Sequence, residues 1–238
     1  MKFLTTLSIF IGALLVSSCN LIGIGEKGNG NVIKQNRNVA SFSKLTVNGV
    51  FHVIINQGEM EAVVVETDEN LAPLITTDVK DGELTLDLKK GKNIRHSTKL
   101  NIYVTIKNID ELAIEGVNQV SSSLLKLPHL MLKSDGVGNN DLQLNCEIFN
   151  AHLSGVGSTK LSGNADSATI HNSGVGSLQA FGFIVQKLNI DNSGVGSAEV
   201  DAEQQISINN SGVGSVKHKG NATIKAANND GVGKIKKE

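Results

Sequence analysis

One set of residues in the sequence could bind a metal ion. His152, His171 and Asp191 each stand three positions before a glycine of a recurring motif, and Asn209 and Asn228 continue the series. Residues that recur in this way would face outward on neighbouring strands roughly 4.8 Å apart. Two imidazoles and a carboxylate at that spacing are suitable ligands for a divalent ion such as Zn²⁺. The competing interpretation is a solvated polar column without a metal, and no other cofactor is expected.

Residues for catalysis are sparse. Polysaccharide-cleaving enzymes need clustered carboxylates and often an Arg or Lys base, but both arginines, Arg37 and Arg95, precede the repeats, and the acids within the repeats are scattered. Cys146 lies in a strand-like segment, which favours a buried structural thiol over a nucleophile. We therefore expect a non-enzymatic protein with no catalytic residues. A polysaccharide-active enzyme remains the alternative.

The recurring motif is Gly-Val-Gly, as in "NNSGVGS" at 209–215. A phosphate-binding glycine loop would need a following helix and usually a lysine, which these copies do not supply. From Gly116 onward the first glycines are 18 to 20 residues apart, a spacing typical of a solenoid in which each repeat is one coil. We interpret the glycines as structural corners, where the backbone takes positive φ or packs closely. These corner glycines are Gly136, Gly155, Gly174, Gly194, Gly212 and Gly231.

The residues around each glycine predict a parallel β-helix rather than a leucine-rich repeat, since neither the leucine pattern nor a helical return segment is present. Two apolar columns are expected to point inward. The first, four positions before the glycine, is Ala151, Ile170, Ile190, Ile208 and Ala227, and the second, directly after it, is Val137, Val156, Val175, Val195, Val213 and Val232. Two positions before the glycine stand Asn172, Asn192, Asn210 and Asn229. Stacked amides can bond along the axis as an Asn ladder.

The beginning of the chain predicts export. Lys2, an apolar run at 3–16 and small residues before Cys19 resemble a lipoprotein signal peptide, and the run is short for a membrane span. We expect residues 1–19 to be this signal, with Cys19 lipidated, and Asn20 favours the outer membrane. Whether the protein faces the periplasm or the cell surface stays open. Cys146 would then be alone, without a disulfide partner.

Further divisions follow from composition. Residues 20–38 are rich in glycine and asparagine, which predicts a flexible tether. Residues 39–115 alternate apolar and polar side chains, which predicts β-strands that start or cap the solenoid. Residues 116–238 are expected to form the repeat β-helix. A short helical turn is expected within 69–79.

The net charge of −1 gives no attraction to nucleic acid. Aromatic residues are only 3%, which disfavours sugar binding by ring stacking and leaves open polar recognition along a flat face.

The pattern also resembles a known family, the bacterial putative auto-transporter adhesin, head GIN domain proteins. The residues that carry the resemblance are "FSKLTVNGVFHVIINQG", then "AVVVETDENLAPLITTDVKDGELTLDL", then the "SGVGS" coils, over roughly residues 38–233. The resemblance implies an all-β, right-handed parallel β-helix on exported proteins of Bacteroidota-type bacteria. It brings no catalytic residues.

Together these observations predict a lipid-anchored outer-membrane β-solenoid that serves as a binding, adhesion or scaffolding module of the cell envelope. Its partners could be the membrane through the lipid, a glycan, an envelope or surface protein, or another copy through the open final coil, where Lys234, Lys236 and Lys237 would oppose stacking. A purely structural spacer is the second alternative.

Overall fold

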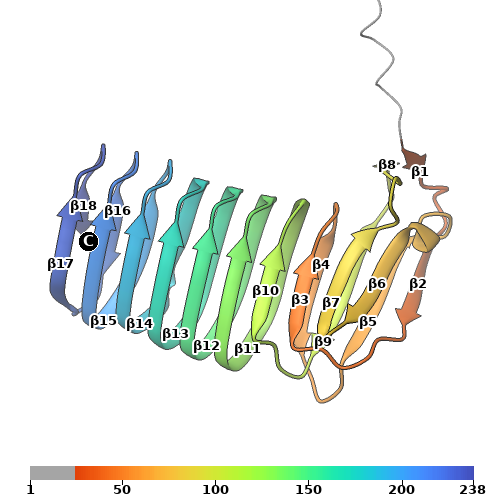
Figure 1. Ribbon diagram of the computed structural model, residues 1–238, viewed down its shortest axis with the longest axis horizontal. Coiled ribbons are helices and arrows are strands. Elements are labelled where there is room, and N and C mark those ends of the chain that lie inside the picture. The colour runs from red at the N-terminus through yellow and green to blue at the C-terminus, as the bar shows by residue number, and fades with distance from the viewer. Residues whose placement is uncertain (1–24) are drawn as a thin grey trace, which may run out of the picture.

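Long strands that alternate buried and exposed residues form the repeat region of the computed structural model, which describes residues 25–238. These strands are β11 (Val117–Ser134), β12 (Val137–Leu153), β13 (Val156–Asn172), β14 (Val175–Asn192) and β15 (Ala198–Asn210), followed by β16 (Val216–Lys219), β17 (Thr223–Asn229) and β18 (Ile235–Lys237). From β11 to β16, each strand pairs in parallel with a strand of the next coil. The coils stack along the long axis of the molecule (Figure 1) as a β-solenoid of about seven turns with ~19-residue coils. The predicted all-β solenoid is confirmed.

The N-terminal strands start the solenoid and close its first end (Figure 1). Five run parallel to the coils: β3 (Lys44–Val47), β4 (His52–Gln57), β7 (Glu83–Leu88), β9 (Leu100–Ile106) and β10 (Glu111–Ile114). Three are antiparallel to their neighbours at the edges: β2 (Val32–Arg37), β5 (Ala62–Asp68) and β6 (Ile75–Lys80). A 3₁₀-helix, η1 (Ala72–Leu74), provides the expected helical turn. In residues 25–238 no helix is long and apolar enough to cross a membrane.

No break in the sheet separates the cap from the repeats. Ile114 of β10 pairs with Ser134 of the first long coil on one side and with Val47 of β3 on the other. The coil geometry thus begins with β3 and β4, well before the first Gly-Val-Gly motif.

The segment expected as a flexible tether, residues 20–38, contains ordered strands. β1 (Glu26–Lys27) pairs with β8 (Ile94–His96), and β2 pairs with β5. Between them, the buried Asp68 accepts hydrogen bonds from the backbone N–H of Gly30 (2.7 Å) and of Thr98 (2.7 Å). A polar composition does not prevent this, because an edge strand is held by main-chain bonds whatever its outer side chains are. The prediction of a tether is wrong for this part of the segment.

The first predicted inward column forms the core. Ala151, Ile170, Ile190 and Ile208 are buried, whereas Ala227 is exposed because it lies in the final coil. Cys146 is buried as predicted, and burial raises the pKa of its thiol to about 11. The thiol is therefore protonated at neutral pH, as expected of a structural cysteine.

The second predicted column is wrong: the valines after the corner glycines point outward. Val175 is 52% exposed, and the other five valines are at least as exposed as Val137, at 49%. The chain turns at the corner, so the buried positions lie on either side of it, at Asn172 before the turn and Leu178 after it. The valine lies on the outer side of this turn, where no neighbouring strand covers its side chain. The direction of the turn, and not the hydrophobicity of valine, therefore decides where the side chain points.

This orientation predicts unequal effects of substitution. Val175→Thr should change the free energy of unfolding by no more than about 0.5 kcal/mol, because the side chain already contacts water. Leu178→Ala, three residues along the same strand and 0% exposed, should lose about 2–5 kcal/mol. Urea denaturation followed by circular dichroism measures both. Equal losses for the two variants would show that the valines are buried after all.

The predicted Asn ladder is present inside the corner. The side-chain Nδ2 of Asn172 donates to Oδ1 of Asn192 (2.7 Å), Asn192 donates to Asn210 (2.8 Å), and Asn210 donates to Asn229 (2.7 Å). Asn210 also donates to the Gly214 carbonyl, 3.2 Å away. The ladder therefore ties each coil to the next and to its own corner.

Candidate functional site

The residues predicted as a metal site do line up on the outer face of the solenoid. His152 of β12 pairs in register with His171 of β13, which pairs with Asp191 of β14. Asn209 of β15 and Asn228 of β17 extend the column. The parallel register therefore places these five side chains, from five successive coils, in one row.

The row is not arranged as a set of metal ligands. The rings of His152 and His171 stack with centroids 5.0 Å apart and an angle of 8° between their planes, so their nitrogens point in parallel rather than at one ion. His171 Nδ1 is 3.8 Å from Asp191 Oδ2, and Asn209 donates to Asp191 Oδ1 at 3.0 Å. Within residues 25–238, no group of three or more His, Cys, Asp or Glu side chains could hold a metal ion. The structure gives the metal hypothesis no support.

A shallow groove of about 230 Å³ runs beside this row, across β13, β14, β15 and β17. Its other wall is a second column of short side chains, and its floor is the main chain of isoleucines whose side chains point into the core. The second column is Thr169, Asn189, Ser207 and Ala226, and the floor is Ile170, Ile190 and Ile208. Short side chains leave the groove open because nothing rises above the sheet between the two columns.

The groove offers hydrogen bonding with little charge. Its rim carries the imidazole of His171, the carboxylate of Asp191, and amides and hydroxyls that include Asn189, Asn209 and Ser207. Amides and hydroxyls both donate and accept hydrogen bonds. Because the parallel coils repeat every ~4.8 Å, the same kinds of group recur along the axis. This arrangement suits an elongated polar ligand and not a compact ionic one.

The second column was not predicted, although the sequence contains a signal for it. In a strand, side chains alternate between the two faces, so Asn189 must share a face with Asp191, two residues later. Applying that rule to each outward residue would have found Thr169 and Ser207 as well. That these positions form a groove depends on side-chain sizes across separate coils.

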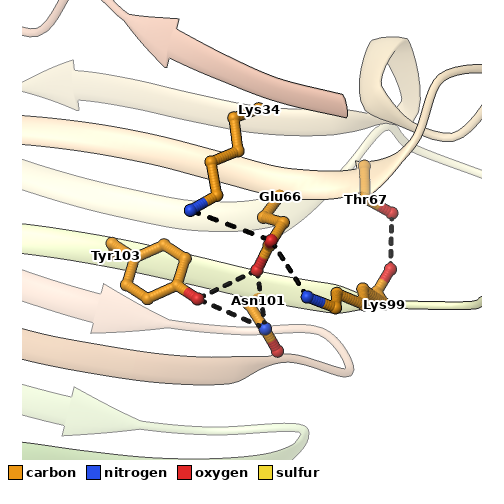
Figure 2. Close-up of polar contacts among 6 residues, drawn as sticks. All are labelled: Lys34, Glu66, Thr67, Lys99, Asn101 and Tyr103. Atoms are coloured by element: carbon orange, nitrogen blue, oxygen red, sulfur yellow. Dashed lines mark hydrogen bonds and ion pairs between the residues drawn. The ribbon is translucent and has the colours of Figure 1, made fainter. Parts of the chain in front are cut away.

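A second polar cluster lies in the N-terminal cap (Figure 2). The buried carboxylate of Glu66 accepts hydrogen bonds from Asn101 (3.0 Å), Tyr103 (2.9 Å) and Lys99 (3.1 Å), and Lys34 lies 3.9 Å away. These bonds, led by that of Asn101, lower the pKa of Glu66 from 4.5 to about 2. Because Lys34 lies in β2 and Asn101 and Tyr103 lie in β9, on either side of β5, the cluster holds the three cap strands together.

The lowered pKa of Glu66 predicts a pH-dependent contribution to stability. A carboxyl whose pKa is lower in the folded state stabilises that state above its unfolded pKa and loses this effect as the pH falls. Glu66→Gln should reduce the free energy of unfolding by about 1–2 kcal/mol at pH 7, since the cluster is partly screened by solvent. The difference between wild type and variant should shrink as the pH falls from about 4.5 to about 2.

Urea denaturation across this pH range measures the difference, with Glu147→Gln at an exposed carboxylate of β12 as the matched control. The control should show no such loss at pH 7. A wild-type-to-Glu66→Gln difference that stays constant down to pH 2 would contradict the role assigned to the carboxylate.

Comparison with known proteins agrees with this architecture. The family model described as "Putative auto-transporter adhesin, head GIN domain" matches residues 41–222. The chain belongs to this family. The match spans the cap strands from β3 onward and most of the Gly-Val-Gly coils, so the two parts form one family unit. No curated protein matches the sequence.

Solved structures show the same fold. A putative adhesin from Bacteroides fragilis NCTC 9343 is 30% identical, with 90% of this chain and 100% of that chain covered and a TM-score of 0.85. A putative adhesin from Parabacteroides distasonis ATCC 8503 is 24% identical (89% and 99% covered, TM-score 0.68). A putative lipid binding protein from the same organism is 22% identical (90% and 99% covered, TM-score 0.69). Family and fold together support a binding or adhesion-type module.

Proposed function

We propose that this protein is a lipid-anchored, non-catalytic module of the bacterial outer membrane that binds an extended glycan along the groove of β13, β14, β15 and β17. The observation that carries the proposal is the groove itself, with its rows of amides, hydroxyls and one carboxylate repeated from coil to coil. A sugar chain presents hydroxyl groups at regular intervals, and the coil repeat presents partners for them at regular intervals.

The residue types in the groove favour a weakly charged ligand. Asp191 is the one acidic residue among the lining residues, and no lysine or arginine lies among them. A strongly anionic polymer would meet the Asp191 carboxylate with no lysine or arginine beside it. Neutral hydroxyl and amide groups match what the rim offers.

The membrane anchor rests on sequence. Cys19 and the rest of the proposed signal peptide lie outside the residues that the structure describes. Strand β1 lies at the capped end of the solenoid (Figure 1), so a lipid on Cys19 would attach the molecule through that end. The coils that carry the groove would then be those farther from the membrane.

A non-catalytic role is supported by the chemistry of the described residues. The Cys146 thiol is buried and held protonated. The Glu66 carboxylate accepts hydrogen bonds from Asn101 and Tyr103 and stabilises the cap strands. A polysaccharide-cleaving enzyme usually needs a pair of carboxyl groups in its groove, whereas Asp191 is the one acidic residue among the lining residues and is bonded to Asn209.

Binding is tested with the purified protein on an array of bacterial and host oligosaccharides. The variant Asn189→Ala/Asp191→Ala/Asn209→Ala should lose at least tenfold in affinity for any glycan that the wild type binds. The matched control is Asn145→Ala/Asn164→Ala, which removes an exposed amide pair on another part of β12 and β13. It should bind as wild type. Equal loss in both variants, or no saturable binding by the wild type, would reject the groove and favour a structural spacer.

Location is tested separately by treating intact cells with a membrane-impermeant protease and following the protein by antibody, with lysed cells as the control for cleavage. Loss of signal from intact cells would place the groove outside the cell and support adhesion. Protection in intact cells but cleavage in lysates would reject adhesion and indicate a periplasmic scaffold.

A further inference from the structure

A small polar cavity lies beneath the corners of β11, β12 and β13, before the start of the Asn ladder. Its volume is about 20 Å³, and its lining includes Ser134, Leu153 and Asn172. These three residues stack in one column, in which Ser134 and Leu153 occupy the positions that asparagines hold in later coils. The amide ladder therefore begins only at Asn172, and the earlier corners must satisfy their polar groups in another way.

Asn140 is the polar residue on the other side of this cavity. It is 5% exposed, and its Nδ2 donates to Ser134 Oγ (3.0 Å) and to Thr159 Oγ1 (3.3 Å). Its Oδ1 is buried and has no hydrogen-bond partner among residues 25–238. A buried acceptor without a partner is costly, and ordered water is the usual explanation for such a group in a native protein.

The groups around the cavity fit a water molecule. A cavity of about 20 Å³ exceeds the roughly 10–15 Å³ that one water needs. The hydroxyls of Ser134 and Thr159 accept from Asn140, and each still carries its own O–H to donate. A water can accept one of these bonds while donating to Asn140 Oδ1.

The same groups fit a cation poorly. All of the residues that line the cavity are uncharged, so an ion there would be desolvated without a carboxylate to compensate it. A water needs no such compensation.

We propose that one ordered water molecule is bound in this cavity, donating to Asn140 Oδ1 and accepting from the hydroxyl of Ser134 or Thr159. It completes the hydrogen bonding of the early corners, where Ser134 and Leu153 replace the ladder asparagines. The water is part of the fold rather than of the groove, so this inference does not depend on the proposed function.

A crystal structure of the protein at about 1.5 Å resolution tests the proposal directly. We expect a density peak at hydrogen-bond distance, about 2.7–3.2 Å, from Asn140 Oδ1 and from one of the two hydroxyls. An empty cavity would overturn the proposal. So would a peak surrounded by several oxygens at about 2.3–2.6 Å, which would indicate a cation.

Two variants provide a second readout. Asn140→Leu should abolish the peak, and the column tolerates an apolar side chain because Val120 and Leu178 occupy it in other coils. Thr159→Val is the smaller change and should lower the occupancy of the water without removing Asn140. In solution, ¹⁷O relaxation dispersion should count one long-lived water fewer in Asn140→Leu than in wild type. An unchanged count would contradict the assignment.

Discussion

Replacing Gly157 by alanine should destabilise the protein by about 4 kcal/mol or more, enough to unfold a typical domain in part at 37 °C. Gly157 has φ +137, and a Cβ at this position would overlap the carbonyl oxygen of Gly138 in the preceding coil. Two costs therefore combine: a backbone conformation that L-residues rarely adopt, and a clash with main chain that cannot move without breaking the inter-coil hydrogen bonds. Urea denaturation at 25 °C measures the loss.

The matched control for this prediction is Gly182→Ala, one coil later. No positive φ applies at Gly182, and the nearest heavy atom to a Cβ there is Ser162 Cβ at 3.5 Å, an ordinary contact. We expect Gly182→Ala to change the free energy of unfolding by no more than about 1 kcal/mol. The expected change is an increase, because alanine restricts the conformations of the unfolded chain. If Gly157→Ala were as stable as Gly182→Ala, the close stacking of corners would not exist in solution.

Asn192→Ala should also be strongly destabilising, with a loss of about 2–4 kcal/mol. Asn192 is 0% exposed and takes part in two ladder bonds, accepting from Asn172 and donating to Asn210. Alanine removes both bonds and leaves a donor and an acceptor buried without their partner, and each such group costs about 1–3 kcal/mol. A cavity replaces the amide as well.

Asn189→Ala, on the same strand but facing solvent, is the control for the ladder and should change stability by no more than about 0.5 kcal/mol. Thermal and urea unfolding of the two variants give the comparison. If both lose the same amount, asparagine content rather than the ladder would explain the stability. If Asn192→Ala unfolds in two steps, the ladder would be shown to couple the C-terminal coils to the rest, since solenoid repeats contact only their neighbours.

The period of the glycines was sufficient to predict the solenoid, and the reason is local. Each coil is one repeat long, so inward residues such as Ile170 and Ile190 recur with the repeat, as do Asn172 and Asn192. In-register parallel stacking then brings equivalent residues together without further information. The core column and the ladder were predicted for this reason, whereas the burial of Cys146 was predicted from the strand-like residues around it.

The sequence was less informative about the second glycine of each motif. Gly157 and Gly176 have positive φ, whereas Gly155 and Gly174 do not. Both sets lie close to the backbone of the preceding coil. Spacing alone marked the first glycine as the corner, but it could not assign the two different constraints within one Gly-Val-Gly motif.

Three features were decided by tertiary structure alone. Val175 faces solvent because the chain turns there, so its environment is set by the path of the backbone and not by its hydrophobicity. The polar strand β2 is ordered because β5 offers it a free edge. The groove exists because short side chains such as Thr169 and Ser207, 38 residues apart in sequence, lie two coils apart in space.

What the sequence by itself determined is thus the repeating part of the molecule: the coil length, the corners, the core and the ladder, each of which depends on residues that recur at one period. What only the tertiary structure decided is everything that depends on shape at a particular place: the outward valines, the captured β2 and the groove. A repeat specifies which residues become neighbours. Which way a corner residue points, and what an edge strand meets, depend on the path of the whole chain.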